Sequence, residues 1–367
     1  MTRVVVAGTG LAGTLLAWRL ACAQPGWSIE LIGPRPASDA TSISGGLVRG
    51  FEVDLESCRQ ATESLVELRD DARLRAWGGY DEIGSVYVCH ELDELAVAAL
   101  VADVDRRLPG SARVLPADAL CAEHGWSGLP AGCLAVVETH AGYYSPDRLR
   151  GEISARLEGL GVGVLDGQVE AIRSEPAAGA SCEVAGRRRG YDALVLAAGS
   201  WTPRLLAGSD LPADGFRTKA VEYAVYEAQG WRPPAFVDDS SGLYGRPLAG
   251  GRILLGIPSE RWDVDPDRLE PSPADAAAAA ELAASRLPRL RLGPALALRA
   301  ASDCYAQPSR LSLQPLGGGG LFTFTGGRGG SAKTALCASR EAADELGRAL
   351  SSGSPVTASA VGMPARP

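Results

Sequence analysis

The sequence predicts an α/β fold that begins with a doubly wound, Rossmann-like nucleotide-binding domain. Arg3–Ala7 is an unbroken apolar run typical of a buried parallel strand, and residues 14–23 have the composition of a helix with one apolar face. The turn Gly8-Thr9-Gly10-Leu11-Ala12-Gly13 joins them. A second apolar strand within residues 191–201 ends in a small-residue turn suited to a close approach of the backbone to a ligand. At 367 residues the chain is long enough for a second domain with its own core.

The glycine turn predicts a dinucleotide site. Gly8 allows a tight turn, Gly10 lets a pyrophosphate approach the backbone, and Gly13 lets the helix pack closely on the strand. The phosphates would lie at the helix N-terminus, where unpaired N–H groups and the helix dipole favour anions. A glycine turn without a ligand is the alternative, but the strand–turn–helix context favours the dinucleotide. The acid that commonly ends the second strand and binds the ribose is replaced by Gly33, so Arg35, backbone groups or a more distant residue would make that contact.

The other elements follow from periodicity and from helix start signals. Ser145-Pro146-Asp147 predicts a helix that runs to about Glu158, and Ser272-Pro273 opens an alanine-rich helix. Further helices are predicted at residues 56–77, 91–108, 117–124 and 333–350. Strands are predicted at residues 27–32, 85–89, 163–174, 182–184, 218–227 and 321–324, and a hairpin at 242–257. Residues 38–50 are predicted as a loop and residues 187–189 as a solvated hairpin turn.

Composition narrows the function classes. The net charge of −8, with no basic block, argues against nucleic acid as a main partner. No apolar run reaches the ~18 residues of a membrane span, and the immediate start in a strand predicts no signal peptide. Eight cysteines without CxxC spacing and only three histidines predict no metal site. Free thiols fit a reducing compartment, and we expect a cytoplasmic protein.

Five stretches together resemble the flavoprotein amine-oxidase family that includes glycine oxidase, sarcosine oxidase and D-amino-acid oxidase. They cover nearly the whole chain in order: VVVAGTGLAG at 4–13, GYYSPDRL at 142–149, YDALVLAAGSWTPRL at 191–205, LYGRPLAGGRILLG at 243–256 and GGRGGSAK at 326–333. The resemblance implies an FAD-binding domain assembled from residues 1–80, 141–215 and 296–350. An α+β substrate-binding domain with a mixed, largely antiparallel sheet is interleaved with it, in residues 81–140 and 216–295, and residues 351–367 form a loose tail.

FAD is the cofactor that the resemblance implies. Its contacts are then expected from Gly8, Gly10, Leu11, Ala12, Gly13, Arg35, Ser42, Gly45, Val169, Ala198, Gly199, Trp201, Cys304, Gly327, Gly329, Gly330, Ser331 and Lys333. Backbone amides of the 326–330 loop and of the helix that follows would stabilise negative charge on the reduced flavin. Cys304 falls where sarcosine oxidase ties its flavin to a cysteine through a thioether. A small buried thiol is the alternative, and we favour non-covalent FAD.

The activity implied is oxidation of the C–N bond of glycine or of an N-substituted glycine or amino acid. Hydride passes from the α-carbon to flavin N5, water hydrolyses the imine to glyoxylate or a 2-oxo acid plus an amine, and O2 is reduced to H2O2. A carboxylate in a partly desolvated pocket calls for a guanidinium or ammonium donor, for which the candidates are Arg49, Arg246, Arg299 and Lys333. Tyr244 is expected to line the pocket. Arg49 and Lys333 rank first because sarcosine oxidase has basic residues in both motifs, while a surface salt bridge is the alternative for any arginine.

Two departures from the family pattern keep other activities open. The lysine that promotes oxygen reduction in sarcosine oxidase falls on Leu254, and its substrate-side histidine falls on Pro258. An FAD dehydrogenase or a flavin subunit that uses another acceptor is therefore one alternative. A nicotinamide-dependent dehydrogenase is the other, although Gly33 in place of the strand-end acid disfavours it.

Overall fold

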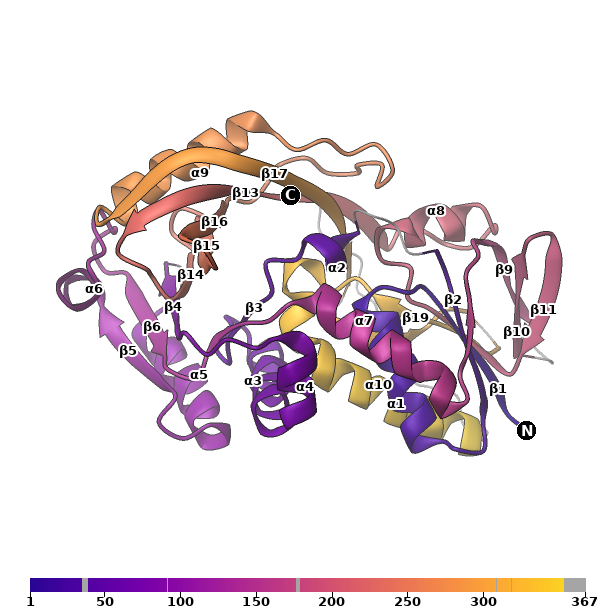
Figure 1. Cartoon of the computed structure of the whole chain (residues 1–367). Coiled ribbons are helices and arrows are strands. Elements are labelled where there is room, and N and C mark those ends of the chain that lie inside the picture. The colour runs from indigo at the N-terminus through magenta and orange to yellow at the C-terminus, as the bar shows by residue number, and fades with distance from the viewer. Residues whose placement is uncertain (35–38, 91, 176–178, 308, 318, 353–367) are drawn as a thin grey trace.

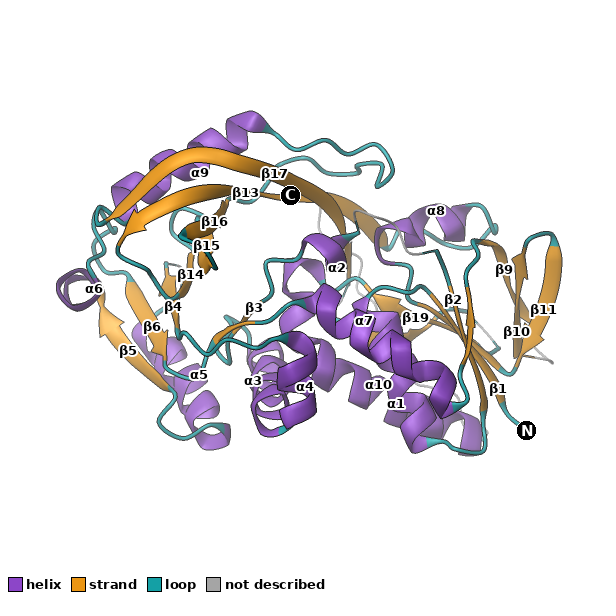
Figure 2. Ribbon diagram, viewed as in Figure 1, coloured by secondary structure: helices purple, strands orange, loops and turns teal. Residues whose placement is uncertain are grey.

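The computed structural model describes residues 1–352, apart from residues 35–38, 91, 176–178, 308 and 318. Arg35 is thus a predicted cofactor contact that lies outside the described residues. The predicted α/β fold is confirmed: helices and two large sheets make up the two halves of the molecule, as Figures 1 and 2 show. Among the described helices none is long and apolar enough to cross a membrane.

The first half is built on a six-stranded sheet that contains the predicted first strand at its centre. Its order is β18 (Ser312–Pro315), β19 (Leu321–Thr325), β12 (Ala193–Leu196), β1 (Arg3–Ala7), β2 (Ser28–Ile32) and β8 (Gly163–Leu165). All neighbours pair in parallel except β18 and β19. The C-terminal ends of β1 and β12 therefore meet at one edge, where doubly wound folds bind their ligands.

The central strand is apolar throughout because both faces of this sheet are covered. Val4 and Val6 pack on the side of α1 (Leu11–Ala23), α7 (Pro146–Leu157) and α10 (Ser331–Ser352). Val5 and Ala7, which point the other way, pack against a three-stranded sheet of β9 (Val169–Glu175), β10 (Gly179–Val184) and β11 (Arg187–Tyr191). Burial on both faces is what an unbroken apolar strand predicts.

The second half is an eight-stranded, largely antiparallel sheet, as expected. Its order is β17 (Leu290–Ala306), β13 (Phe216–Gly230), β16 (Arg252–Gly256), β15 (Tyr244–Leu248), β14 (Ala235–Asp238), β4 (Ser85–Cys89), β6 (Leu134–Glu138) and β5 (Ala112–Pro116), and only β14 and β4 run parallel. Helix α9 (Pro273–Arg286) covers one face, and α5 (Glu94–Arg107) packs with α3 (Leu55–Asp70) near β4 and β6. The long strands β13 and β17 arch from this half to the first one (Figure 1).

Several predicted boundaries are wrong for local reasons. The helix predicted at 56–77 is two helices, α3 and α4 (Ala72–Gly78), because Asp71 is extended and its carboxylate caps α4 by accepting from the amides of Arg73 and Leu74. The strand predicted at 163–174 is likewise two strands, β8 and β9. Residues 187–189 begin strand β11, and the turn lies earlier, at Ala185 and Gly186, both with φ above zero as a tight hairpin turn requires.

The loop predicted at 38–50 contains two short elements that the sequence pattern does not reveal. Helix α2 (Ala40–Ile43) begins at Asp39, whose carboxylate accepts from the amide of Ser42 at 2.7 Å. Strand β3 (Leu47–Val48) pairs with β7 (Gly142–Tyr143), a partner almost a hundred residues away. The remaining elements are α6 (Ala117–His124), α8 (Thr202–Ala207), and the 3-10 turns η1 (Glu158–Leu160), η2 (Gly199–Trp201) and η3 (Arg328–Gly330).

Candidate functional site

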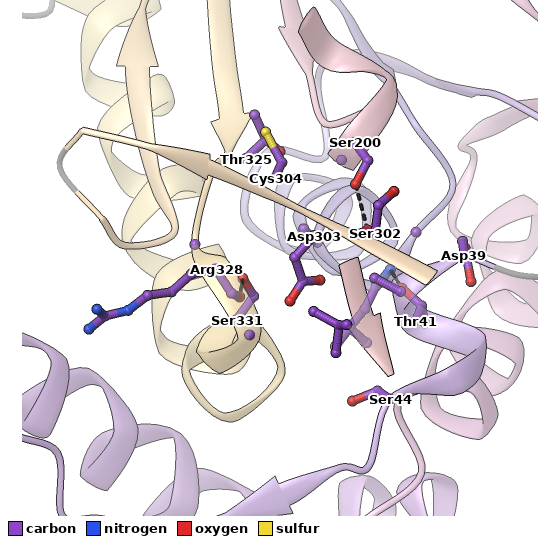
Figure 3. A pocket seen from close by; sticks show the side chains of 18 of the residues that line it. Asp39, Thr41, Ser44, Ser200, Ser302, Asp303, Cys304, Thr325, Arg328 and Ser331 are labelled. Atoms are coloured by element: carbon purple, nitrogen blue, oxygen red, sulfur yellow. Dashed lines mark hydrogen bonds between the residues drawn. The ribbon is translucent and has the colours of Figure 1, made fainter. Parts of the chain in front are cut away.

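A cavity of about 900 Å³ runs between the two halves, from the β1–α1 turn to the underside of the eight-stranded sheet. Most of the predicted site residues line it: Gly8, Gly10, Leu11, Ala12, Gly45, Arg49, Val169, Ala198, Gly199, Trp201, Tyr244, Cys304, Gly327, Gly329, Gly330, Ser331 and Lys333. Figure 3 shows part of this wall. Gly13, Ser42, Arg246 and Arg299 are not among the lining residues.

The β1–α1 turn is built for close backbone packing. Gly8 has φ +130°, and a Cβ added to it would lie 2.2 Å from the carbonyl oxygen of Ala197 at the end of β12. A Cβ added to Gly13 would lie 2.0 Å from the carbonyl oxygen of Gly8, so Gly13 acts by packing rather than by lining the cavity. The N-terminus of α1 faces the cavity, and the Leu11 amide donates to the hydroxyl of Thr41 at 3.0 Å. A glycine-rich turn at a helix N-terminus can receive a diphosphate.

Gly33 at the end of β2 packs closely against the β1–α1 turn. A Cβ on Gly33 would lie 3.2 Å from the amide nitrogen of Thr9, tighter than ordinary contact. The carboxylate nearest in sequence that lines the cavity is Asp39, and it is already bonded to the Ser42 amide and to Arg150. Ser42 itself turns its hydroxyl to the Asp39 carbonyl at 2.9 Å, so its role is to complete the α2 cap.

Two loops meet at the middle of the cavity. The turn after β12 brings Ala198, Gly199 and Trp201 to the wall, and the Ser200 hydroxyl donates to the carbonyl of Ser302 on β17 (Figure 3). The predicted glycine loop brings Gly327, Gly329, Gly330 and Ser331 to the opposite wall, at the start of α10. The N-terminal end of this 22-residue helix therefore lies at the cavity wall, which favours negative charge there.

Arg49 and Lys333 form ion pairs with the same carboxylate, that of Glu52. Glu52 Oε1 is 2.7 Å from an Arg49 guanidinium nitrogen and 2.7 Å from Lys333 Nζ. Arg49 also donates from Nε to the carbonyl of Phe51 at 3.0 Å, and its guanidinium lies 4.6 Å from the centre of the Tyr87 ring. All of these groups are buried or half-buried, so two cations are held at one place on the cavity wall by a single anion.

This arrangement changes the proton affinities of Lys333 and Glu52. Burial and the charge of Arg49 lower the pKa of Lys333 to about 8, and Glu52 opposes that shift. Burial acts to raise the pKa of Glu52, but Arg49 and Lys333 outweigh it, so this pKa lies below its usual value. The cluster therefore carries a net positive charge near neutral pH, as the anchor for a carboxylate requires.

The structure does not bring the other two predicted cations to the cavity wall. Arg246 points away, with its guanidinium 4.0 Å from the centre of the Tyr143 ring and bonds to the carbonyls of Gly45 and Pro247. Arg299 is exposed on β17 and donates to the carbonyl of its neighbour Leu298 at 3.1 Å. Tyr244 does line the cavity, and its hydroxyl donates to the carbonyl of Glu222 at 2.7 Å.

Cys304 and its neighbour Asp303 lie on opposite sides of β17. Figure 3 shows the Cys304 thiol beside Thr325, while the Asp303 carboxylate points the other way. Burial raises the pKa of the Cys304 thiol to about 12, so the thiol stays protonated. Sequence reasoning singled out Cys304 and missed Asp303, although strand alternation requires that the two face different ways.

Other cavity residues also escaped the sequence analysis. They come mainly from the 39–46 segment and from β13 and β17, and they include Asp39, Thr41, Ser44, Lys219, Tyr223, Asp303, Tyr305 and Arg328. Glu52, which positions the two cations, was missed as well. For Lys219 and Tyr223 a signal existed: the alternating pattern of residues 218–227 predicts that every second side chain shares one face.

Comparison with known proteins gives one family and one fold. The family model described as DAO, FAD dependent oxidoreductase, matches residues 3–345. Iminodiacetate oxidase from Chelativorans sp. BNC1 superposes with a TM-score of 0.72 at 17% identity, covering 96% of each chain. Glycine oxidase from Geobacillus kaustophilus gives 0.73 at 18% identity over 95% of each chain. L-proline dehydrogenase from P. horikoshii gives 0.76 at 14% identity, over 96% of this chain and 94% of the other.

At these identities the solved structures are evidence for the fold alone. No curated protein sequence matches the chain. The substrate must therefore be inferred from the residues that line the cavity and not from the activity of a relative.

Proposed function

Because the chain belongs to the DAO family of FAD-dependent oxidoreductases, we propose that it oxidises the C–N bond of glycine or of an N-substituted glycine or amino acid. Bound FAD supplies the acceptor for the two electrons that leave the amine. The chain's own residues hold the carboxylate, orient the α-carbon and keep water out. Hydrolysis of the imine then gives glyoxylate or a 2-oxo acid and an amine.

The residues of the cavity fit FAD. At one end, Gly8 and Gly13 let β1, β12 and α1 pack backbone to backbone, which brings the N-terminus of α1 to the cavity wall, where a diphosphate can bind. In the middle, the 327–330 backbone and the start of α10 suit the negative charge that a flavin ring gains on reduction. We expect non-covalent FAD, because the Cys304 thiol is buried beside Thr325 and its high pKa leaves little thiolate.

The observation that supports this substrate class is the pair of cations on Glu52. Arg49 and Lys333 share one carboxylate oxygen, so one of their charges is left over for an anionic ligand. A substrate carboxylate bound there would be fixed by charge-assisted hydrogen bonds, which also restrict where the α-carbon lies. Ile257 and Pro258 contribute apolar side chains to the cavity lining, which suits contact with an N-alkyl substituent.

Anaerobic mixing tests the proposal. The holoprotein is mixed with glycine, sarcosine and longer N-alkylglycines, and the yellow flavin absorbance is followed. We expect at least one of them to bleach it, and dimethylamine, which is sarcosine-like but lacks the carboxylate, to leave it unchanged. Persistent yellow absorbance with every member of the series contradicts the proposal.

An FAD dehydrogenase with an acceptor other than O2 is the second candidate. The observation that favours it is Leu254, which stands where the resemblance to sarcosine oxidase expects a lysine and is 1% exposed. The two candidates are separated by reoxidation of the substrate-reduced protein. Rapid return of the yellow colour on mixing with oxygenated buffer supports the oxidase, and rapid return only with an artificial quinone supports the dehydrogenase.

Replacement Cys304→Ala should leave FAD in place. We expect the variant to keep its flavin content. On acid precipitation the flavin of both wild type and variant should move into the supernatant, because the thiol is protonated and turned toward Thr325. Flavin that stays with the precipitated wild type but leaves the variant would instead identify a thioether at this cysteine.

Replacement Glu52→Gln should move the alkaline limb of kcat/KM to lower pH. Carboxylate binding needs protonated Lys333, which exists below its pKa of about 8. Glu52 raises that pKa, so loss of its charge lowers the pKa further and ends activity at a lower pH. Glu52→Asp, which keeps the charge, is the control. If the alkaline limb of Glu52→Gln stays at the wild-type pH, Lys333 does not bind the substrate carboxylate.

A further inference from the structure

Asp303 is an unengaged carboxylate that faces the cavity. It lies on β17, and Figure 3 shows its side chain directed between the start of α10 and the α2 segment. Among the residues that the structure describes, none forms a hydrogen bond or an ion pair with the Asp303 side chain, although this side chain is only partly exposed. A carboxylate in such a place is costly unless a ligand supplies the partner.

The charged and titratable groups around Asp303 do not neutralise it. Those that share the cavity wall on the elements packed against it are Asp39 at the start of α2, Lys219 and Tyr223 on β13, Tyr244 on β15, Cys304 and Tyr305 on β17, and Arg328 in η3. Lys219 is the register partner of Asp303, but its ammonium lies 4.7 Å from the centre of the Trp262 ring and 3.9 Å from Glu260. Burial is the cause that raises the pKa of Asp303 to about 6, so the group is ionised near neutral pH.

Asp303 and the cationic cluster flank the same glycine loop. A Cβ on Gly329 would lie 3.4 Å from Asp303 Oδ2, and a Cβ on Gly330 would lie 3.0 Å from Lys333 Cε. The Asp303 carboxylate and the Lys333 side chain thus lie against neighbouring residues of one loop, and both line the cavity. An amino acid, which is a carboxylate and an ammonium two bonds apart, has the complementary pattern of charge.

We propose that the Asp303 carboxylate binds the ammonium group of the substrate and accepts one of its protons. This role rests on the amino-acid oxidation proposed above. One N–H bond breaks, its electron pair stays on nitrogen as a lone pair, and an O–H bond forms on Asp303. The amine becomes neutral, as loss of hydride from the α-carbon to the bound flavin requires, and the proton passes to water when the product leaves.

The test compares Asp303→Asn with wild-type holoenzyme in two measurements. The first is the dissociation constant of methoxyacetate, an isostere of sarcosine with an ether in place of the amine, measured from the change that it causes in the flavin spectrum. The second is kred/Kd for sarcosine, the rate constant of flavin reduction divided by the dissociation constant of the substrate, measured by anaerobic stopped flow over a range of pH. Asp263→Asn is the matched control, because this exposed carboxylate pairs with Arg217 outside the cavity lining.

We expect Asp303→Asn to lower kred/Kd for sarcosine by about 100-fold or more near neutral pH, in the range of a lost general base. The deficit should shrink as the pH rises, because sarcosine then loses its proton unaided. Methoxyacetate should bind the variant as well as wild type or better. The assignment is overturned if kred/Kd is the same in the two proteins. It is also overturned if Asp303→Asn weakens the binding of methoxyacetate by the same factor as it lowers kred/Kd for sarcosine.

The wild-type pH profile is the second readout and does not depend on the variant's folding. Log kred/Kd should rise with unit slope to an apparent pKa near 6, the value for Asp303. A profile that stays flat below this pH overturns the assignment. Failure of the proposed function has a different signature, since sarcosine and the other N-alkylglycines would then leave wild-type flavin yellow.

Discussion

Gly13→Ala is expected to yield a protein without flavin. The new Cβ would lie 2.0 Å from the carbonyl oxygen of Gly8 and 3.2 Å from Cβ of Ala197, and neither backbone can move without displacing β1 or β12. Helix α1 must therefore shift away from the sheet, and the amides at its N-terminus leave the position that a diphosphate needs. Overpacking of this kind costs about 1–3 kcal/mol or more, and the ligand site loses its geometry as well.

The measurement for Gly13→Ala is flavin content after incubation with excess FAD and gel filtration. Gly26→Ala is the control, because a Cβ there meets nothing within 4 Å. The control should carry as much flavin as wild type. A Gly13→Ala protein that keeps its flavin would mean that the close packing of α1 on the turn does not form the dinucleotide site.

Lys333→Met is expected to lower kcat/KM for the best amino-acid substrate by roughly 30–1000-fold while flavin remains bound. The loss of a desolvated charged partner typically costs about 2–4 kcal/mol. Here the substitution removes the ammonium group of Lys333 itself. It also leaves Glu52 paired with Arg49 alone, so that the charge of Arg49 is neutralised as well. Steady-state kinetics with the substrate found by anaerobic screening would measure it, together with the flavin spectrum as evidence of an intact fold.

Arg299→Met is the matched comparison for Lys333→Met. Arg299 is one of the four candidate carboxylate anchors, but the structure places this side chain on the exposed face of β17, bonded to the Leu298 carbonyl. We expect kcat/KM of Arg299→Met to stay within about twofold of wild type, as for ordinary surface substitutions. A large loss of kcat/KM in Arg299→Met, with little change in Lys333→Met, would identify Arg299 on β17 as the residue that binds the substrate carboxylate.

Local signals were strong enough to predict the framework of the fold. The apolar run Arg3–Ala7, the glycine turn and the following helix form as predicted, although α1 begins at Leu11, three residues earlier than its composition indicates. The helix that begins at Ser145-Pro146 was also located correctly, because the Ser145 hydroxyl accepts from the amide of Arg148 as an N-cap should. These features depend on residues close together in the chain.

Features that depend on distant partners could not be predicted. Strand β3 exists only because β7 pairs with it, and α2 depends on Asp39, whose second oxygen is held by Arg150 from α7. The different surroundings of Arg49 and Arg246 also depend on distant parts of the chain. Arg49 and Arg246 are both buried, at 6% and 9% exposure, and only the path of the backbone decides that the first faces the cavity and the second faces Tyr143.

The most direct test of the account is the absorption spectrum of the purified chain, incubated with FAD and separated from free cofactor, before and after acid precipitation. We expect about one flavin per chain, yellow before precipitation and recovered in the supernatant afterwards. Addition of sarcosine without oxygen should then change the spectrum of the intact protein. A chain that emerges colourless from excess FAD would contradict the claim that this cavity is a flavin site.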